Sequence, residues 1–170
     1  MPKQLTEKRL MNIALFYLER FETSDKKLRN VLRRRVSRMK SQGVEIPAET
    51  PQWIDSVLAR VQELGCLNND RYAETQVRLL VGQGRSDQYI LMKLKSMGIP
   101  EKTVRGLLDT SGISELDRAK HYAQKKHIGP YRSTSEPVDK KKELGVLARA
   151  GFSYEIAVSV LGASPDTNEG

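Results

Sequence analysis

The apolar residues of this chain recur at intervals of three or four positions along almost its whole length, with charged and polar residues between them. That spacing places the apolar side chains on one face of an α-helix. An alternation with a period of two, which is typical of β-strands, is not sustained anywhere long enough to predict one. The pattern therefore predicts an all-α protein with nine major helices.

Residues that commonly begin helices precede the first three apolar segments. Thr6 and Ser24 are expected N-caps, and Thr50 with Pro51 is expected to start the third helix as cap and first-turn proline. Gly65 is expected to end that helix. The residues expected to face inward are Leu10, Ala14, Tyr17, Leu18 and Phe21 in the first helix, Leu28, Val31, Leu32, Val36 and Met39 in the second, and Ile54, Val57, Leu58 and Val61 in the third.

The same pattern returns further along the chain. The stretch "LKSMGIPEKTVRGLL", which begins at Leu94, matches "LARAGFSYEIAVSVL", which begins at Leu147, with an offset of 53 residues. A Ser-Asp pair occurs at 24–25 and again at 86–87, an offset of 62 residues. Gly98 and Gly151 each fall where a helix is expected to end, a place where glycine accepts the left-handed conformation. The offsets indicate that one three-helix unit has been used repeatedly, with 12 extra residues between the second and third helices of the first unit. The repeat places Leu32, Leu94 and Leu147 in equivalent core positions.

These matches predict three tandem three-helix repeats, over 1–65, 66–112 and 113–163, followed by a flexible tail over 164–170. A unit of this size buries too little surface to be stable alone, so neighbouring repeats are expected to stack into an elongated, curved array. The alternative is a compact all-helical domain whose periodicity is accidental.

The charge of the chain favours polyanionic partners. Among its 170 residues, 29 are basic and 21 acidic, for a formal net charge of +8, and nucleic acid is the first candidate partner for such a balance. The opening residues lack the apolar core of a signal peptide, and no apolar run approaches the ~20 residues that cross a bilayer. We therefore expect a cytoplasmic protein that does not contact membranes, and we expect it to be a monomer.

Residue patterns for catalysis or metal binding are weak throughout. His121 and His127 are six residues apart, whereas ligands on one helical face need a spacing of three or four. The "GQGR" of 82–85 lacks the spacing of a phosphate-binding loop. Cys66, the only cysteine, rules out an intramolecular disulfide and is interpreted as a small apolar filler. The sequence predicts no enzyme activity, no metal and no cofactor.

The second predicted helix carries the strongest candidate site. From Asp25 to Lys40 there are eight Lys or Arg residues and one acid. On a helical wheel they form two stripes on either side of the apolar face. Arg35 falls in the apolar sector, so either the helix bends there or its side chain extends along its alkyl stem to water. No aromatic residue interleaves with them, which argues against a base-stacking platform and favours contact with phosphates or acidic side chains. The first stripe contains Lys26, Arg29, Arg33 and Lys40, and the second contains Lys27, Arg34 and Arg38.

Three motifs of the chain resemble the RecX family, which regulates the bacterial RecA recombinase. They are "YLERFETSDKKLRNVL" at 17–32, "GCLNNDRYA" at 65–73 and "LARAGFSYEIAVSVL" at 147–161. The chain departs from the family at Phe21, where a second basic residue is more usual, at Cys66, where an aromatic is common, and in the 12-residue insertion.

The resemblance implies tandem three-helix repeats in a curved protein that lies in the groove of the RecA filament on DNA. It implies suppression of strand exchange, ATP hydrolysis and LexA cleavage, in DNA repair and the SOS response, without enzyme activity. A general nucleic-acid-binding protein that acts without a recombinase would explain the same charge. The two hypotheses differ in whether binding to a DNA strand rises strongly once RecA coats it.

Overall fold

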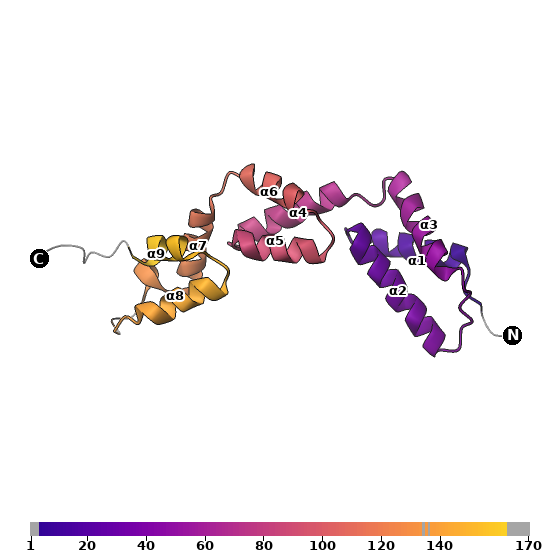
Figure 1. Ribbon diagram of the computed structural model, residues 1–170, viewed down its shortest axis with the longest axis horizontal. Coiled ribbons are helices and arrows are strands. Elements are labelled where there is room, and N and C mark those ends of the chain that lie inside the picture. Colours follow the sequence, from indigo (N-terminus) through magenta and orange to yellow (C-terminus); the bar gives the residue numbers. More distant parts are fainter. Residues whose placement is uncertain (1–3, 134, 136, 163–170) are drawn as a thin grey trace, which may run out of the picture. The chain divides into compact units, whose positions relative to one another are not determined.

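The computed structural model of the protein describes residues 4–133, 135 and 137–162, and these residues are helical with no named strand (Figure 1). The prediction of an all-α protein with nine major helices is confirmed for this part of the chain. The described residues also form one short 3₁₀ turn and an isolated backbone bridge between Gln4 and Glu45, which the sequence analysis did not predict. The elements are α1 (Glu7–Leu18), α2 (Asp25–Ser41), α3 (Thr50–Glu63), α4 (Asn69–Gly82), α5 (Asp87–Ser96), α6 (Glu101–Asp109), α7 (Glu115–Lys126), η1 (Gly129–Tyr131), α8 (Lys140–Arg149) and α9 (Tyr154–Leu161).

The chain divides into two compact units. The first contains Met1–Ala73 with Met97–Ile99, and the second contains Glu74–Ser96 with Pro100–Gly170. The finer division into repeats over 1–65, 66–112 and 113–163 stays a prediction. The tail expected over 164–170 lies outside the described residues.

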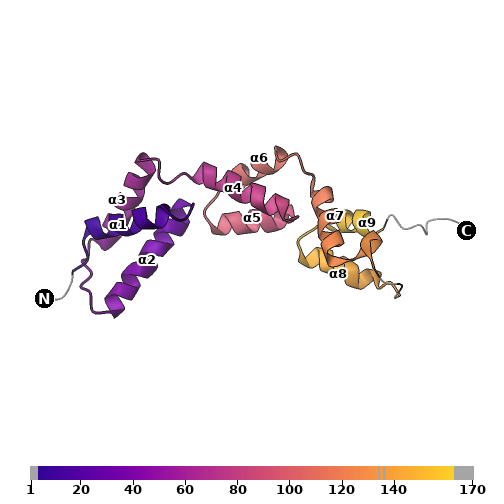
Figure 2. The same ribbon diagram turned by 180° about the vertical axis from the view of Figure 1, so that it is seen from behind.

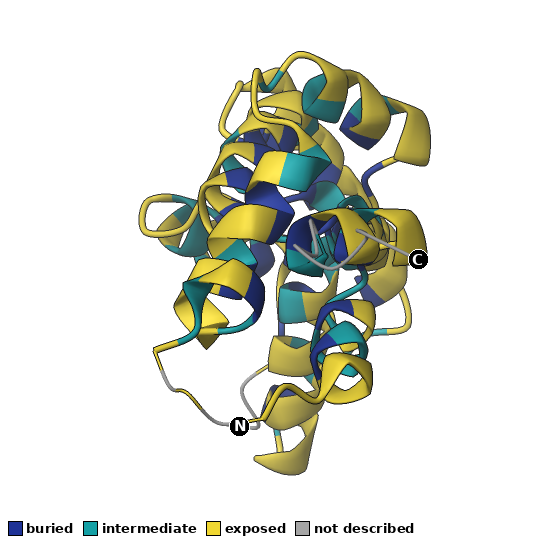
Figure 3. Ribbon diagram, turned by 90° about the vertical axis from the view of Figure 1, so that its left-hand side faces the viewer, coloured by how far each residue is buried: buried dark blue, intermediate teal, exposed yellow. Residues whose placement is uncertain are grey.

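The core of the first unit lies between α1, α2 and α3, which contact one another in pairs (Figure 2). The Thr6 hydroxyl accepts the Arg9 N–H at 3.2 Å and so begins α1, as predicted. In α1, α2 and α3 the buried apolar residues recur on one side of each helix. Figure 3 shows that buried and exposed positions occur together on the helices that face the viewer. The buried cluster contains Leu5, Leu10, Ala14, Leu28, Leu32, Met39, Ile54, Val57, Leu58, Val61 and Leu67.

The second unit has a separate cluster around α7, α8 and α9, with Ala119, Ala123, Leu147, Phe152, Ala157 and Val160 at its centre. Here α9 packs against both α7 and α8. In the same unit α5 packs against α6, and Leu94 and Val104 from these helices are fully buried. Leu32, Leu94 and Leu147, which the sequence predicts as core residues, are all 0 % exposed.

Each unit contains one contact between an N-cap serine and a helix end far away in the sequence. In the first unit Ser24 Oγ accepts the Lys27 N–H and donates to the Met97 carbonyl at 2.6 Å. In the second, Ser86 Oγ accepts the Tyr89 N–H and donates to the Ala150 carbonyl at 2.8 Å. Both serines are buried, so each hydroxyl satisfies one donor and one acceptor away from water.

The aspartate that follows each of these serines also makes a matching hydrogen bond in the two units. The Asp25 N–H donates to Asn69 Oδ1 at 2.8 Å, and the Asp87 N–H donates to Glu115 Oε1 at 2.9 Å. These matched contacts give the repeated Ser-Asp pair a structural reason that its spacing alone did not reveal. Each pair begins one helix and forms hydrogen bonds with two segments that are distant in the sequence.

Gly98 and Gly151 follow the two carbonyls that accept these serine hydroxyls. Their φ angles are +83° and +92°, which confirms the predicted left-handed conformation. A second constraint is close approach, because a Cβ at Gly98 would lie 2.8 Å from Lys26 Cβ and one at Gly151 would lie 2.5 Å from Ser86 Oγ. Glycine is therefore required at both positions for conformation and for space.

Three local predictions are wrong. Phe21 does not face the core; it lies beyond the end of α1 and is exposed. Thr50 does not cap α3, because its hydroxyl donates to the Pro47 carbonyl at 2.6 Å and Glu49 occupies the cap position. Cys66 is exposed in the turn after α3 and does not fill an apolar space.

Candidate partner interface on helix α2

Helix α2 is a well-capped helix with a buried face and two basic flanks. Ser24 caps it, Asp25 lies in its first turn, and Arg38 and Lys40 lie in its last turn, an arrangement that complements the helix dipole. Leu28, Leu32 and Met39 are buried against the rest of the first unit. This burial fixes the rotation of α2 about its axis and so decides where its cations point.

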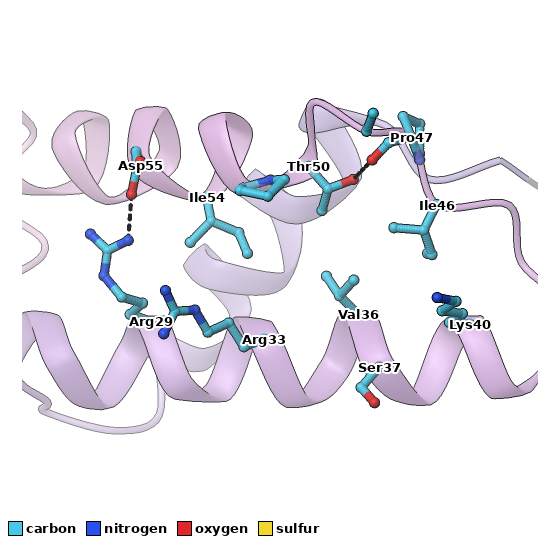
Figure 4. Close-up of a pocket in the computed structure, with 12 residues that line it drawn as sticks. Arg29, Arg33, Val36, Ser37, Lys40, Ile46, Pro47, Thr50, Ile54 and Asp55 are labelled. Carbon is cyan, nitrogen blue, oxygen red and sulfur yellow. Dashed lines mark hydrogen bonds and ion pairs between the residues drawn. The ribbon is translucent and has the colours of Figure 1, made fainter.

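One flank of α2 borders a groove of about 530 Å³ that we call the α2–α3 groove (Figure 4). Arg29 reaches across it and forms an ion pair with Asp55 of α3, and Arg33 points in beside Ile54. The segment before α3 forms one end, where Ile46 and Pro47 face Lys40. Its lining residues are Arg29, Arg33, Val36, Ser37, Lys40, Ile46, Pro47, Ala48, Thr50, Pro51, Ile54 and Asp55.

The other flank borders a second groove, of about 570 Å³, that we call the α1–α2 groove. Its basic residues are Arg9 of α1 and three arginines of α2, and no carboxylate of the described part of the chain lines it. Phe16, on the α1 side, is 60 % exposed, and the Arg20 guanidinium lies 3.6 Å from the centre of its ring. The lining residues are Arg9, Asn12, Ile13, Phe16, Tyr17, Val31, Arg34, Arg35 and Arg38.

The chain is similar over most of its length to several proteins that are all named regulatory protein RecX. It is 36% identical over 169 residues to the regulatory protein RecX of Myxococcus xanthus (strain DK1622), a match that covers 96% of this chain and 90% of the relative. The chain belongs to the RecX family. It is also 29% identical to the regulatory protein RecX of Agrobacterium fabrum, over 93% of this chain and 84% of the relative. No family model matches the sequence.

Solved RecX structures share the fold. A crystal structure of RecX from Lactobacillus salivarius matches with a TM-score of 0.65 at 20% identity, over 91% of this chain and 93% of that one. A second RecX crystal structure also gives a TM-score of 0.65, at 17% identity. The RecX resemblance deduced from three motifs is thus confirmed, and the relatives are named as regulatory proteins.

The first RecX-like motif, at 17–32, coincides with the end of α1, the Ser24 cap and the first half of α2. Of the seven cations predicted as the site, the structure divides five between the two grooves: Arg29, Arg33 and Lys40 in one, and Arg34 and Arg38 in the other. Lys26 and Lys27 line neither groove, and Lys26 packs its side-chain carbons near Gly98. These five residues are grouped as the two stripes group them, Lys26 and Lys27 lie outside both grooves, and binding of a partner by any of the seven stays a prediction.

The sequence reasoning missed two features of this RecX chain. Arg35 is exposed, as one of the two alternatives for it allowed, but the sequence did not show that it lines the α1–α2 groove with Arg34 and Arg38. Phe16 and Tyr17 lie in that same groove, although no aromatic interleaves with the basic residues in the sequence. The spacing of Arg9, Ile13 and Phe16 along α1 shows that they share a face, but only packing shows which groove that face lines.

Neither a membrane span nor a metal site is found among the described residues. Within them no helix is long and apolar enough to cross a bilayer. The same part of the chain contains no group of three or more His, Cys, Asp or Glu side chains arranged to hold a metal ion.

Proposed function

We propose that this RecX-family protein binds the RecA filament on DNA, in its groove, and inhibits strand exchange, ATP hydrolysis and LexA cleavage. Membership of the RecX family is the observation that carries the proposal. We further propose that it acts in the cytoplasm as a monomer, without a cofactor and without enzyme activity of its own.

The basic flanks of α2 support a contact of this kind. The proposed contact residues are Lys26, Lys27, Arg29, Arg33, Arg34, Arg38 and Lys40. Of these, Arg29 already has an acidic partner in Asp55. Arg33, Arg34 and Arg38 are exposed, and no ion pair joins their guanidinium groups to another described residue. Unpaired arginines on a rigid helix suit phosphates or carboxylates of a partner, because the planar guanidinium binds both with two parallel hydrogen bonds.

The direct test measures RecA activity in the presence of the full chain. With the cognate recombinase assembled on single-stranded DNA, ATP hydrolysis and strand exchange should both fall when the protein is added in amounts stoichiometric with RecA. A chain bound in the filament groove would hinder filament growth or subunit cycling. If both activities are unchanged, the proposed function is wrong.

A salt titration tests which groups meet the partner. The triple variant Arg33→Ala, Arg34→Ala, Arg38→Ala is compared with wild type on bare DNA and on RecA-coated DNA. If the three arginines meet phosphates, the slope of log affinity against log salt should fall by about 2 to 3, since each lost contact removes roughly 0.7 to 0.9. If they meet carboxylates of RecA, binding to bare DNA should hardly change, and binding to the coated filament should weaken.

A matched control has the same change in net charge at another place. Lys95, Lys102 and Lys120 are exposed cations of the second unit, and their triple alanine variant should bind like wild type. Equal losses in the two triple variants would show that net charge alone drives binding. Equal affinity of wild type for bare and coated DNA would favour the general nucleic-acid-binding function, which the net charge of +8 also supports.

A further inference from the structure

We propose that the α1–α2 groove binds an acidic amphipathic helix of a partner protein. The inference deepens the proposed function, on which it rests, by naming the chemistry of the protein surface that the first unit would recognise. It is argued from the shape, apolar floor and charge of the groove.

The groove has the form of a docking site for one helix. From α1 its lining residues fall at positions 9, 12, 13, 16 and 17, and from α2 at 31, 34, 35 and 38, so each helix contributes a single face. At 1.5 Å per residue these faces extend for about 10 to 12 Å, which corresponds to roughly two turns of a docked helix. Ile13, Phe16 and Val31 supply apolar surface between the two helices. A partner helix with apolar residues at positions i, i+3, i+4 and i+7 fits such a surface.

The charge of the groove selects an acidic partner. Arg9, Arg34, Arg35 and Arg38 line it, and none of them forms an ion pair with another described residue. The α2–α3 groove differs, because Asp55 lines it and neutralises Arg29. Four unpaired guanidinium groups around an apolar floor attract carboxylates that flank an apolar stripe.

The floor favours a protein helix over nucleic acid. Part of it is aliphatic, from Ile13 and Val31, and these side chains pack on other aliphatic groups. Single-strand binding sites instead offer free aromatic faces to bases. Here the Arg20 guanidinium already lies over the Phe16 ring, and the Tyr17 ring is 5.0 Å from that of Phe21. Duplex DNA presents mainly phosphates and sugars on its outside, and its apolar thymine methyls lie within the major groove.

The test uses defined peptides and the full-length chain. The probe is a fluorescent helical peptide of about 18 residues with leucines on one face and glutamates beside them, a length at which a helix begins to be stable in water. Its control replaces every glutamate with lysine, and a fluorescent oligothymidylate tests for single-stranded DNA. Anisotropy should show binding of the glutamate peptide, weakened by salt, and much weaker binding of the lysine peptide.

Matched variants locate the site. Phe16→Ala and the pair Arg34→Ala with Arg38→Ala should each weaken peptide binding by about tenfold or more, as expected for anchor residues of a small interface. Two controls should bind the peptide as wild type does: the pair Lys95→Ala with Lys102→Ala, exposed cations of the second unit, and Leu79→Ala, a similarly exposed apolar residue on α4. Circular dichroism confirms that each variant is folded.

Three outcomes overturn the inference. One is failure of the glutamate peptide to bind better than the lysine peptide, and another is equal loss in the Lys95 and Lys102 double variant and in the groove variants. The third is oligothymidylate binding that depends on Phe16 while peptide binding does not, which would assign the groove to single-stranded DNA. Inhibition of RecA by wild type, measured in parallel, separates failure of this inference from failure of the proposed function.

Discussion

The two compact units share the serine contact and fully buried leucines, but they use their arginines differently. In the first unit the arginines of α2 at 33, 34, 35 and 38 are exposed. In the second, Arg118 is only 3 % exposed, donates to the Arg85 carbonyl at 2.6 Å and pairs with Asp87. Arg132 donates two hydrogen bonds of 2.7 Å to the carboxylate of Glu143. Arg118 and Arg132 thus support the fold of the second unit, whereas these four arginines of the first unit have no ion-pair partner among the described residues.

This difference has a physical consequence for mutation. A buried guanidinium left without its carboxylate keeps its full desolvation cost, whereas an exposed one is solvated and loses little. Substitutions that break the ion pairs of Arg118 or Arg132 should therefore lower the stability of the second unit. Substitutions of the exposed arginines on the flanks of α2 should instead change partner binding. The following predictions test that contrast, beginning with the cores, where the two units should behave alike.

Truncating a core leucine should cost the most in either unit. Leu32→Ala and Leu94→Ala remove fully buried side chains from the first and the second unit, and each should lower the free energy of unfolding by about 2 to 5 kcal/mol. Urea unfolding followed by circular dichroism measures this. A loss below about 0.5 kcal/mol for either variant would contradict the core assignment.

Removing the partner of Arg118 should cost somewhat less. Asp87→Ala leaves a buried guanidinium without its carboxylate and should lower the free energy of unfolding by about 3 kcal/mol. The double variant with Arg118→Leu also removes the charge and should recover part of the loss. If Asp87→Ala unfolds like wild type, the ion pair does not support the second unit.

Gly151→Ala should destabilise the second unit by about 2 to 3 kcal/mol, because its Cβ would meet Ser86 Oγ at a positive φ. Gly112→Ala is the matched control. Its φ of +74° is similar, but no atom lies within 4 Å of an added Cβ. Only the backbone strain, about 1 to 2 kcal/mol, should then remain. Equal losses in the two variants would show that close approach at Gly151 adds nothing.

The ion pair of Glu143 should give a smaller, pH-dependent effect. The hydrogen bonds from Arg132 lower the pKa of Glu143 from its ordinary value of 4.5, so the folded state favours the charged carboxylate. The stability this contributes is present above that ordinary value and is lost as the pH falls through the lowered pKa.

The measurement compares wild type with Glu143→Gln by urea unfolding between about pH 7 and pH 3. The difference in unfolding free energy should be largest near neutral pH and should shrink as the solution is acidified. Glu74→Gln, at an exposed position on α4, is the control and should track wild type throughout. A difference that does not vary with pH would contradict the role of the charge.

The exposed arginines on the flanks of α2 should affect the free energy of unfolding least, although they should affect partner binding most. The triple alanine variant of Arg33, Arg34 and Arg38 should unfold within about 0.5 kcal/mol of wild type, because these exposed side chains have no ion-pair partner among the described residues. Thermal and urea unfolding measure this. A loss of more than about 1 kcal/mol would mean that the flanks of α2 support the fold as well.

The sequence by itself determined the helices, their main caps, the core leucines and the family. Each of these follows from local or periodic information: a serine before an apolar stripe, a spacing of three or four, or a glycine where a helix must end. Ser24, Leu94 and Gly151 were assigned correctly for these reasons. The two basic stripes of α2 were likewise predictable, since they follow from the wheel of one helix.

The tertiary structure decided which groups from different helices meet. Periodicity gives the face of a helix but not its neighbour, so it could not show that Phe16 and Arg34 line one groove, or that Asp55 pairs with Arg29. Nor could it show that Arg118 is buried and Cys66 exposed, because burial of a single residue depends on contacts distant in the sequence. Which arginines support the fold, and which have no ion-pair partner among the described residues, is for that reason a property of packing.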